Sequence, residues 1–276
     1  RNGGHVGTGQ RTDQPSIEKW VGMEAAKGLW QLGLDAVQKV CELIDEYQID
    51  CELGSGNLHL AAKLSHAEEL QEELEHLESQ YGYRQLSYLA PEAVAERTSA
   101  QGFYGALLDD GCRHLHPLKY ALGLARAAAE AGARIYEQSR AQPAPDGQSG
   151  EVKTTQGYVK AQHVVLGCNA YLGKLMPRLA GNIMPINNFV IATEPLPSHL
   201  LPRINRDNLS MSDTLFVINY WKLSEDGRIL FGGGENYSSH FPRDIKAFVR
   251  PHMLNIYPEL EKIEVEYGWG GAVGIT

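Results

Sequence analysis

The chain has 276 residues, of which 43% are hydrophobic and 21% charged, and its 34 acidic against 25 basic side chains give a formal net charge of −9. This length suits one large domain or two ordinary ones with a substantial core, and the composition excludes a disordered or fibrous chain. The excess of acid excludes nucleic acid as the expected partner, because phosphates call for a basic patch. No apolar run in the sequence approaches the ~20 residues of a membrane-spanning helix, so no membrane partner is expected.

The first third of the chain predicts helices around one strand. Residues 1–15 are rich in glycine and polar side chains, which is typical of a loop. Ser16–Tyr47 has apolar side chains three and four positions apart, which predicts a helix, and its glycines predict one break. The alternation within Cys51–Lys63 predicts a strand, after which Ser65 is expected to cap an acidic helix that ends at Tyr81.

The middle of the chain has the pattern of a doubly wound α/β domain. Gly105–Leu108 predicts a strand, and an Ala-rich helix is expected from His116 to Gly132, with a proline in its first turn. Ala133–Tyr136 predicts a second strand. A hairpin is expected within 151–159, followed by a buried strand at His163–Gly167.

Beyond Asn182 the pattern becomes β-rich. Phe189–Ala192 predicts a strand and Leu215–Gly233 a hairpin, followed by a helix at Asp244–Ile256 and a final strand at Ile263–Tyr267. The predicted fold class is therefore α/β together with a β-rich domain.

Four cysteines are scattered along the chain without a CxxC motif or any paired His/Cys spacing. This pattern predicts free thiols in a reducing compartment, the cytoplasm, and no metal site. His114 and His116 flank Leu115, a spacing that could share a metal, but no further ligand follows, so capping or packing is the favoured interpretation. Cys168 follows a predicted buried strand, where a buried thiol is favoured over a reactive one.

Two glycine clusters admit a functional and a structural interpretation. Gly3–Gly9 has the composition of a phosphate-binding loop, but no strand precedes it in the sequence, so a plain loop is favoured. Gly232–Gly234 closes a predicted strand, where either a bulge or the close approach of another group is expected.

The sequence predicts no catalytic side chain. No Gly-x-Ser-x-Gly motif is present, and no catalytic triad can be assembled from the spacing of its residues. Tyr220, Trp221 and Trp269 lie in predicted strands, where they pack in a core or line a pocket.

The string Arg1-Asn2-Gly3-Gly4 resembles the end of the GASGRNGG segment of the D-amino-acid-oxidase-like FAD-dependent oxidoreductases. The similarity continues in chain order through Tyr104–Asp109, His114–Pro117, Gly132–Glu137, Val164–Gly173, Leu230–Gly234 and Trp269–Thr276. Within the family, the resemblance is closest to the gamma-glutamylputrescine oxidoreductase branch, through Tyr47–Cys51 and Asn169–Gly173.

This resemblance implies part of a Rossmann-like FAD-binding domain and an α+β substrate domain with a mixed or antiparallel sheet. Residues 1–50 would be a loop and helices of the FAD domain, and 114–176 a further segment of it. Residues 51–113 and 177–276 would form the substrate domain. The chain would be truncated at both ends, with a GxGxxG unit upstream of it.

The implied activity is oxidation of the C–N bond of a small amine by hydride transfer to FAD. The alternatives are an oxidase or dehydrogenase of another amine or amino acid, such as sarcosine or a D-amino acid, and a non-catalytic binding domain on the same scaffold. A homo-oligomer remains open. The truncated chain itself would be colourless and inactive, since segments that hold the flavin would be absent from it.

The resemblance also implies site residues. Those expected at the cofactor are Arg1, Asn2, Gly3 and Gly4 at the flavin edge, Ala141 at the adenine, and Gly167, Cys168 and Asn169 along the diphosphate. Tyr220 and Trp269 are the candidates for the substrate pocket.

Overall fold

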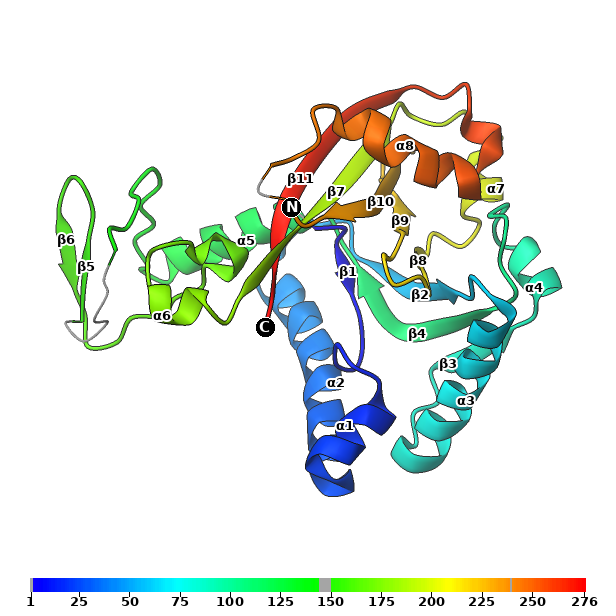
Figure 1. Ribbon diagram of the computed structural model, residues 1–276, viewed down its shortest axis with the longest axis horizontal. Helices are drawn as coiled ribbons and strands as arrows, with labels where there is room; N and C mark the ends of the chain where they lie inside the picture. The colour runs from blue at the N-terminus through cyan, green and yellow to red at the C-terminus, as the bar shows by residue number, and fades with distance from the viewer. Residues whose placement is uncertain (1, 144–149, 239) are drawn as a thin grey trace.

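The computed structural model describes residues 2–143, 150–238 and 240–276, and its main feature is one nine-stranded sheet (Figure 1). The strand order is β1-β4-β2-β8-β9-β10-β7-β11, and β3 pairs with β4 beside this path. The pairing of β2 with β8 is parallel, and the other pairings described are antiparallel. The strands of this sheet are β1 (His5–Val6), β2 (Gly54–Leu60), β3 (Leu86–Leu89), β4 (Ala106–His114), β7 (Met184–Thr193), β8 (Ser210–Asp213), β9 (Tyr220–Leu223), β10 (Ile229–Asn236) and β11 (Val265–Ile275).

Helices flank the sheet on both sides. Figure 1 shows α8 above it and α1, α2 and α3 below it. The helical elements are α1 (Gln14–Val21), α2 (Met23–Glu46), α3 (Leu64–Tyr81), α4 (Pro91–Ala95), α5 (Pro117–Glu130), η1 (Asn169–Leu172), α6 (Pro177–Ala180), α7 (Leu201–Ile204), α8 (Ile245–Ile256) and η2 (Pro258–Leu260). Within the described chain, none of these helices has both the length and the apolar character needed to span a membrane.

The predicted helices form with small differences at their ends. The long helix of the first third breaks once, at Gly22 between α1 and α2, as expected. Lys63, and not Ser65, is the N-cap of α3, and it makes no side-chain capping bond. His116 caps α5, because its side chain accepts a hydrogen bond from the backbone N–H of Lys119 at 3.3 Å.

The two faces of the sheet differ in polarity, which follows from alternation along each strand. Leu58 and Leu60 of β2 and Trp221 of β9 are fully buried on one face, in a core that includes Val249 and Met253 of α8. The neighbours of these residues along the strands are polar and belong to the opposite face. At one end of that polar face, α3 packs on Leu107 of β4.

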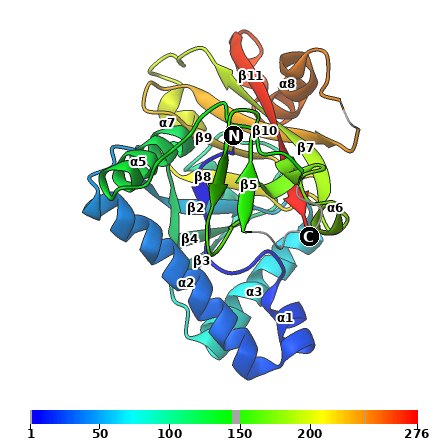
Figure 2. The ribbon, with the colours of Figure 1, turned by 90° about the vertical axis from the view of Figure 1, so that its left-hand side faces the viewer.

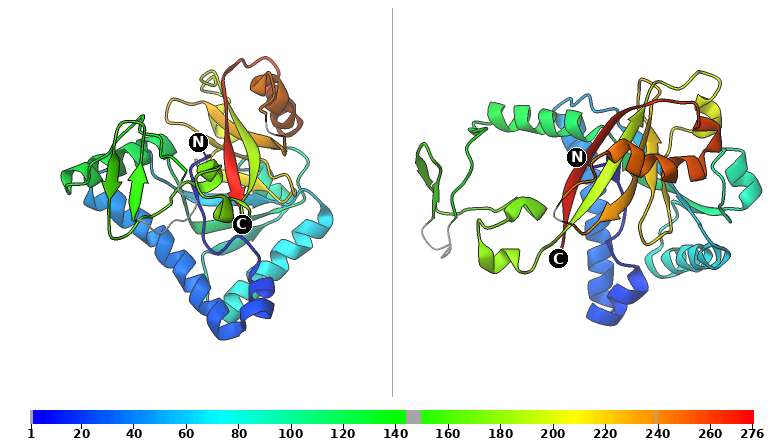
Figure 3. Two further views of the ribbon diagram at one scale, coloured as in Figure 1. Left: turned by 60° about the vertical axis from the view of Figure 1, so that its left-hand side comes forward. Right: turned by 45° about the horizontal axis from the view of Figure 1, so that its top comes forward.

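The helices below the polar face meet around one aromatic residue. The ring of Trp30 on α2 lies 5.6 Å from that of Tyr81 at the end of α3 and 5.2 Å from that of Tyr83. Glu18 of α1 accepts hydrogen bonds from the Tyr81 hydroxyl and from His76 Nε2, both at 2.7 Å. Figures 2 and 3 show the result, in which α2 and α3 converge below the sheet with α1 at their junction.

Two strands of the predicted doubly wound domain are not formed. Ala133–Tyr136 and His163–Gly167 have no strand structure, and Val165 is 91% exposed where a buried strand was expected. Both segments lie in a lobe with α5 and a separate hairpin of β5 (Glu151–Lys153) and β6 (Tyr158–Lys160), on the left of Figure 1. A strand needs a neighbour for its backbone hydrogen bonds, and the described residues offer none beside these two segments.

Candidate functional site

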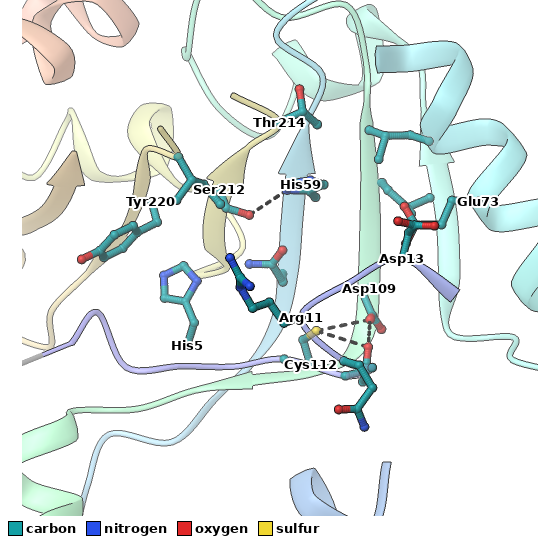
Figure 4. A pocket seen from close by; sticks show the side chains of 18 of the residues that line it. His5, Arg11, Asp13, His59, Glu73, Asp109, Cys112, Ser212, Thr214 and Tyr220 are labelled. Carbon is teal, nitrogen blue, oxygen red and sulfur yellow. Dashed lines mark hydrogen bonds between the residues drawn. The ribbon is translucent and has the colours of Figure 1, made fainter. Parts of the chain in front are cut away.

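An open cavity of about 1290 Å³ lies between the polar face of the sheet, the N-terminal segment and α3. Figure 4 shows side chains from all three converging on it. Residues 2–15, which contain the short edge strand β1, form one of its walls. Pockets for a single small ligand usually measure about 300–1,000 Å³, so this cavity has room for a ring system together with a second small molecule.

The floor of the cavity is built from hydrogen-bonded pairs across β2 and β8. The parallel register places Asn57 opposite Ser210 and His59 opposite Ser212. Asn57 Nδ2 donates to Ser210 Oγ at 3.0 Å, and His59 Nδ1 lies 2.9 Å from Ser212 Oγ. Burial and the neighbouring His66 lower the pKa of His59 to about 4. The floor is therefore polar but uncharged at neutral pH.

Tyr220 and His5 form one end of the cavity. The two rings meet edge to face, with centroids 5.6 Å apart, and the Tyr220 hydroxyl donates to Asn188 Oδ1 at 2.5 Å. Burial, followed by Glu235, raises the pKa of Tyr220, so its hydroxyl keeps its proton. Burial, His114 and Lys222 lower the pKa of His5 to about 4, so its ring is neutral. The buried Nε2 of His5 has no hydrogen-bond partner within the described part of the chain.

Asp109 of β4 fixes the N-terminal segment to the sheet. Its Oδ1 accepts from the Tyr83 hydroxyl at 2.6 Å and from the backbone N–H of Gly111 at 2.8 Å. Its Oδ2 accepts from the Thr8 hydroxyl at 2.7 Å and from the Cys112 thiol at 3.2 Å. Burial and Asp109 raise the pKa of Cys112 to about 12, which makes this thiol unreactive at neutral pH.

Acidic side chains dominate the cavity wall. Among the described residues that line it, Arg11 and Arg113 are the arginines, and the carboxylates belong to Asp13, Glu69, Glu72, Glu73, Asp109 and Asp213. Desolvation in the cavity, together with Asp13 and Asp109, raises the pKa of Glu73. An excess of negative charge in a cleft attracts cations.

The structure brings four of the predicted site residues together. Asn2, Gly3, Gly4 and Tyr220 all line the cavity, whereas Arg1 lies outside the described residues. Trp269 lies on β11 opposite Val190, on the same face as the cavity-lining Val273, but does not line the cavity itself.

The other predicted cofactor residues lie away from the cavity, in the lobe that contains α5. Ala141 and Gly167 are in irregular segments, and Cys168 directly precedes η1. Asn169 joins this lobe to the sheet, because its Oδ1 accepts from the backbone N–H of Gly274 on β11 at 2.7 Å.

The structure shows the roles of His114 and His116, the state of the cysteines and the conformation of Gly232–Gly234. His116 caps α5, and His114 is buried with its Nε2 2.8 Å from the Asn208 carbonyl oxygen. The described residues contain no group of three or more His, Cys, Asp or Glu placed to hold a metal ion. The four cysteines are unpaired, as predicted, but Cys168 is half-buried where a buried thiol was expected, because the strand predicted before it does not form. The register of β10 against β7 shifts between Gly232 and Glu235, so the glycine triplet forms a bulge.

Sequence reasoning missed His59, Ser212 and Arg11. A signal for the floor was present, since polar residues alternate with Leu58 and Leu60 in β2 and with Met211 in β8. The alternation predicts a strand, but it does not show what the polar side chains of that strand face. Arg11 lies in a segment without regular structure, where no sequence pattern indicates the direction of a side chain.

Comparisons with known proteins agree on one family. The family model of FAD dependent oxidoreductases (DAO) matches residues 1–276. The chain is 38% identical to "Probable oxidoreductase OrdL" of Rhizobium meliloti over 277 residues, which cover all of this chain and 64% of that protein. It is 35% identical to the gamma-glutamylputrescine oxidoreductase of Escherichia coli, again over its whole length and over 65% of that protein.

Solved structures show the same fold. Glycine oxidase from Geobacillus kaustophilus superposes with a TM-score of 0.74 at 20% identity, covering 99% of this chain and 71% of that one. L-proline dehydrogenase from P. horikoshii gives 0.70 at 20% identity, covering 87% of this chain and 66% of that one. The chain thus spans slightly under two thirds of the curated relatives it matches. With a family model that matches it from end to end, the chain belongs to the FAD dependent oxidoreductases.

Proposed function

We propose that the protein oxidises the C–N bond of a small amine similar to gamma-glutamylputrescine, with FAD as the electron acceptor. The relative in Escherichia coli that carries this activity in its name supports the substrate class. The observation that carries the proposal is the charge of the cavity, whose lining carboxylates outnumber its arginines. A cavity of this charge favours a substrate that arrives as a cation.

The cavity fits a flavin beside its N-terminal wall. Its volume exceeds that of a pocket for one small ligand. The unpartnered Nε2 of His5 supplies a hydrogen-bonding atom beside Asn2, Gly3 and Gly4, which we propose as contacts of the flavin edge. Gly4 has a φ of +78°, and a Cβ atom there would lie 2.0 Å from the carbonyl oxygen of Leu115. This part of the wall therefore needs glycine.

The remaining cofactor residues are proposals from the family resemblance. Ala141 would contact the adenine, and Gly167, Cys168 and Asn169 would lie along the diphosphate. When bound, FAD supplies the chemistry of the reaction by accepting a hydride from the carbon that carries the nitrogen.

The chain itself would bind and orient the amine. The carboxylates on α3 attract the cation, and neutral His5 and His59 do not repel it. The Tyr220 hydroxyl donates a hydrogen bond to Asn188 Oδ1, so its lone pair is left to accept a hydrogen bond from the amine. We propose Tyr220 as a residue that positions the substrate. Trp269 does not line this cavity, so its role at the substrate stays a prediction of the family resemblance.

An anaerobic reduction experiment tests this function. The FAD-loaded protein would be mixed without oxygen with gamma-glutamylputrescine, sarcosine or D-alanine, and the absorbance of the oxidised flavin at about 450 nm would be followed. Fast bleaching by gamma-glutamylputrescine supports the proposal. Preferential bleaching by sarcosine or D-alanine would support the alternative substrate class.

A further inference from the structure

Asn188 of β7 has a hydrogen-bond donor that the fold does not use. Its Oδ1 accepts from the Tyr220 hydroxyl at 2.5 Å, and its side-chain NH₂ group has no hydrogen bond among the residues that the structure describes. Asn188 lines the same end of the cavity as His5 and Tyr220, whose rings are shown in Figure 4. The N–H groups of the Asn188 side chain are therefore open to a molecule in the cavity.

Other asparagines of the sheet use the same group to hold the protein together. Asn187, the preceding residue, is buried and donates through Nδ2 to Asn236 Oδ1 at 2.8 Å. Asn57 on the floor of the cavity donates through Nδ2 to Ser210 Oγ at 3.0 Å. Asn188 differs from both, because its acceptor is bound within the protein while its donor faces the cavity.

The position of this donor is fixed by the strands around it. Asn188 is paired with Glu235 of β10 on one side and with Gly271 of β11 on the other. The Tyr220 ring is also tightly packed, because a Cβ atom at Gly3 would lie 2.5 Å from its Cε2. A donor held in this way keeps its direction without a ligand, so little freedom is lost when a ligand binds.

The chemistry of an N–H donor decides which part of a substrate it can bind. An ammonium group has only donors and cannot use it, and in the proposed function the reacting amine bonds the Tyr220 oxygen instead. A carboxylate could accept, but negative charge already acts at this end, since Glu235 follows burial as a cause of the raised pKa of Tyr220. A neutral carbonyl oxygen accepts without this repulsion.

We infer that Asn188 donates a hydrogen bond to the amide carbonyl oxygen of the substrate, so that the site selects N-acylated diamines over amines without a carbonyl group. In gamma-glutamylputrescine a butane chain separates the reacting amine from this amide. The Tyr220 oxygen and the Asn188 amide are neighbours, and a hydrogen bond of about 2.9 Å at each end lets them hold the two ends of such a chain. This inference rests on the proposed function, since it names a second recognition group of the same substrate.

The test compares two amines of equal length. N-acetylputrescine contains the amide, and heptylamine has methylene groups in its place. Asn188→Leu keeps the approximate size of the side chain and removes the donor. We expect kcat/KM for N-acetylputrescine to fall about 10-fold, mainly through KM, because one neutral hydrogen bond is lost. The value for heptylamine should change less than about threefold.

An ester identifies the atom that is recognised. Aminobutyl acetate keeps the carbonyl oxygen but has no amide N–H, so in Asn188→Leu its kcat/KM should fall as that of N-acetylputrescine does. A loss for the amide without a loss for the ester would mean that the substrate N–H is recognised, which would overturn the inference.

Asn57→Leu is the matched control. Asn57 also lines the cavity, but its Nδ2 is already bound to Ser210. The kcat/KM values of this variant for N-acetylputrescine and heptylamine should change by the same factor. An equal change for both amines in Asn188→Leu, or no loss for N-acetylputrescine, would overturn the inference.

Equilibrium binding separates this inference from the proposed function. N-butylacetamide contains the amide but no amine that could be oxidised, and calorimetry would measure its binding to the FAD-loaded protein. It should bind about 10-fold more weakly to Asn188→Leu and to Asn188→Asp, which keeps the shape of the side chain and its bond from Tyr220 but has no donor. Equal binding to the unaltered protein and to Asn188→Asp would overturn the inference. If no amine is oxidised, the proposed function fails, while the binding of N-butylacetamide still decides whether Asn188 is a carbonyl site.

Discussion

Tyr220 on β9 donates its hydroxyl hydrogen bond to Asn188 on β7 by reaching across the strand between them. That strand is β10, and Gly232 is the residue beneath the ring, paired with Tyr220 on one side and Val190 on the other. A Cβ atom at Gly232 would lie 2.1 Å from Cζ of Tyr220. The glycine therefore makes room for the aromatic wall of the cavity, beside the bulge that follows it.

Replacing Gly232 by alanine should push the Tyr220 ring away from Asn188. Overpacking of this kind costs about 1–3 kcal/mol, so urea unfolding should show a lower free energy of unfolding. Gly28→Ala on α2 is the control, because a Cβ there meets open space. Alanine in a helix should be neutral or stabilising by up to about 1 kcal/mol. A Gly232→Ala protein as stable as the Gly28→Ala protein would contradict the close contact.

Replacing Asp109 by asparagine should loosen the N-terminal wall of the cavity. Both carboxylate oxygens accept from donors, so the new NH₂ group must face a donor on one side. We expect a loss of about 2–3 kcal/mol in the free energy of unfolding, measured by urea unfolding, and weaker FAD binding. Asp110→Asn, at the exposed neighbouring position, should leave both unchanged. Equal behaviour of the two variants would show that Asp109 does not anchor the segment.

His5 and His59 should make the protein less stable in mild acid. The pKa values of His5 and His59 are lowered to about 4 in the folded protein, from 6.5. Between these values the unfolded chain binds more protons, so the free energy of unfolding should fall as the pH drops from 6.5 toward 4. Because solvent in the open cavity screens these charges, each histidine should lower the free energy of unfolding by about 1–2 kcal/mol.

Urea unfolding at pH 7 and pH 5 would measure this loss. His59→Gln should reduce the difference between the two pH values, since glutamine can still bond the Ser212 hydroxyl but does not titrate. His199→Gln, on the exposed surface, should leave the difference unchanged. A His59→Gln protein with the full acid loss would place the effect on other groups.

The four cysteines should remain thiols with different reactivity. Denatured without reductant, the protein should give four groups that react with a thiol reagent, since none is paired. In the folded protein Cys112 should react slowest, because burial and Asp109 raise its pKa to about 12. Mass spectrometry of the labelled peptides would identify each site, and two or fewer free thiols in the denatured protein would contradict this expectation.

Local patterns predicted the elements whose structure is set locally. The apolar spacing and glycines of Ser16–Tyr47 indicated two helices with one break, and the structure has them. Ala133–Tyr136 and His163–Gly167 were wrongly predicted as strands, because a strand depends on a neighbour that composition does not reveal. Tyr220 could be predicted as a pocket residue. The hydrogen bond between His59 and Ser212 could not be predicted, since it depends on the pairing of two segments far apart in the chain.

The parallel pairing of β2 with β8 also has a consequence for synthesis on the ribosome. His59 and Ser212 are 153 positions apart. At translation rates of about 5–20 residues per second, β2 waits roughly 10–30 s before its partner exists. During that interval β2 has an unpaired edge, which is open to pairing with another nascent chain. The site floor is therefore completed only once β8 has been synthesised, later than the pairings of β4 with β1, β2 and β3, and the edge of β2 stays unpaired until then.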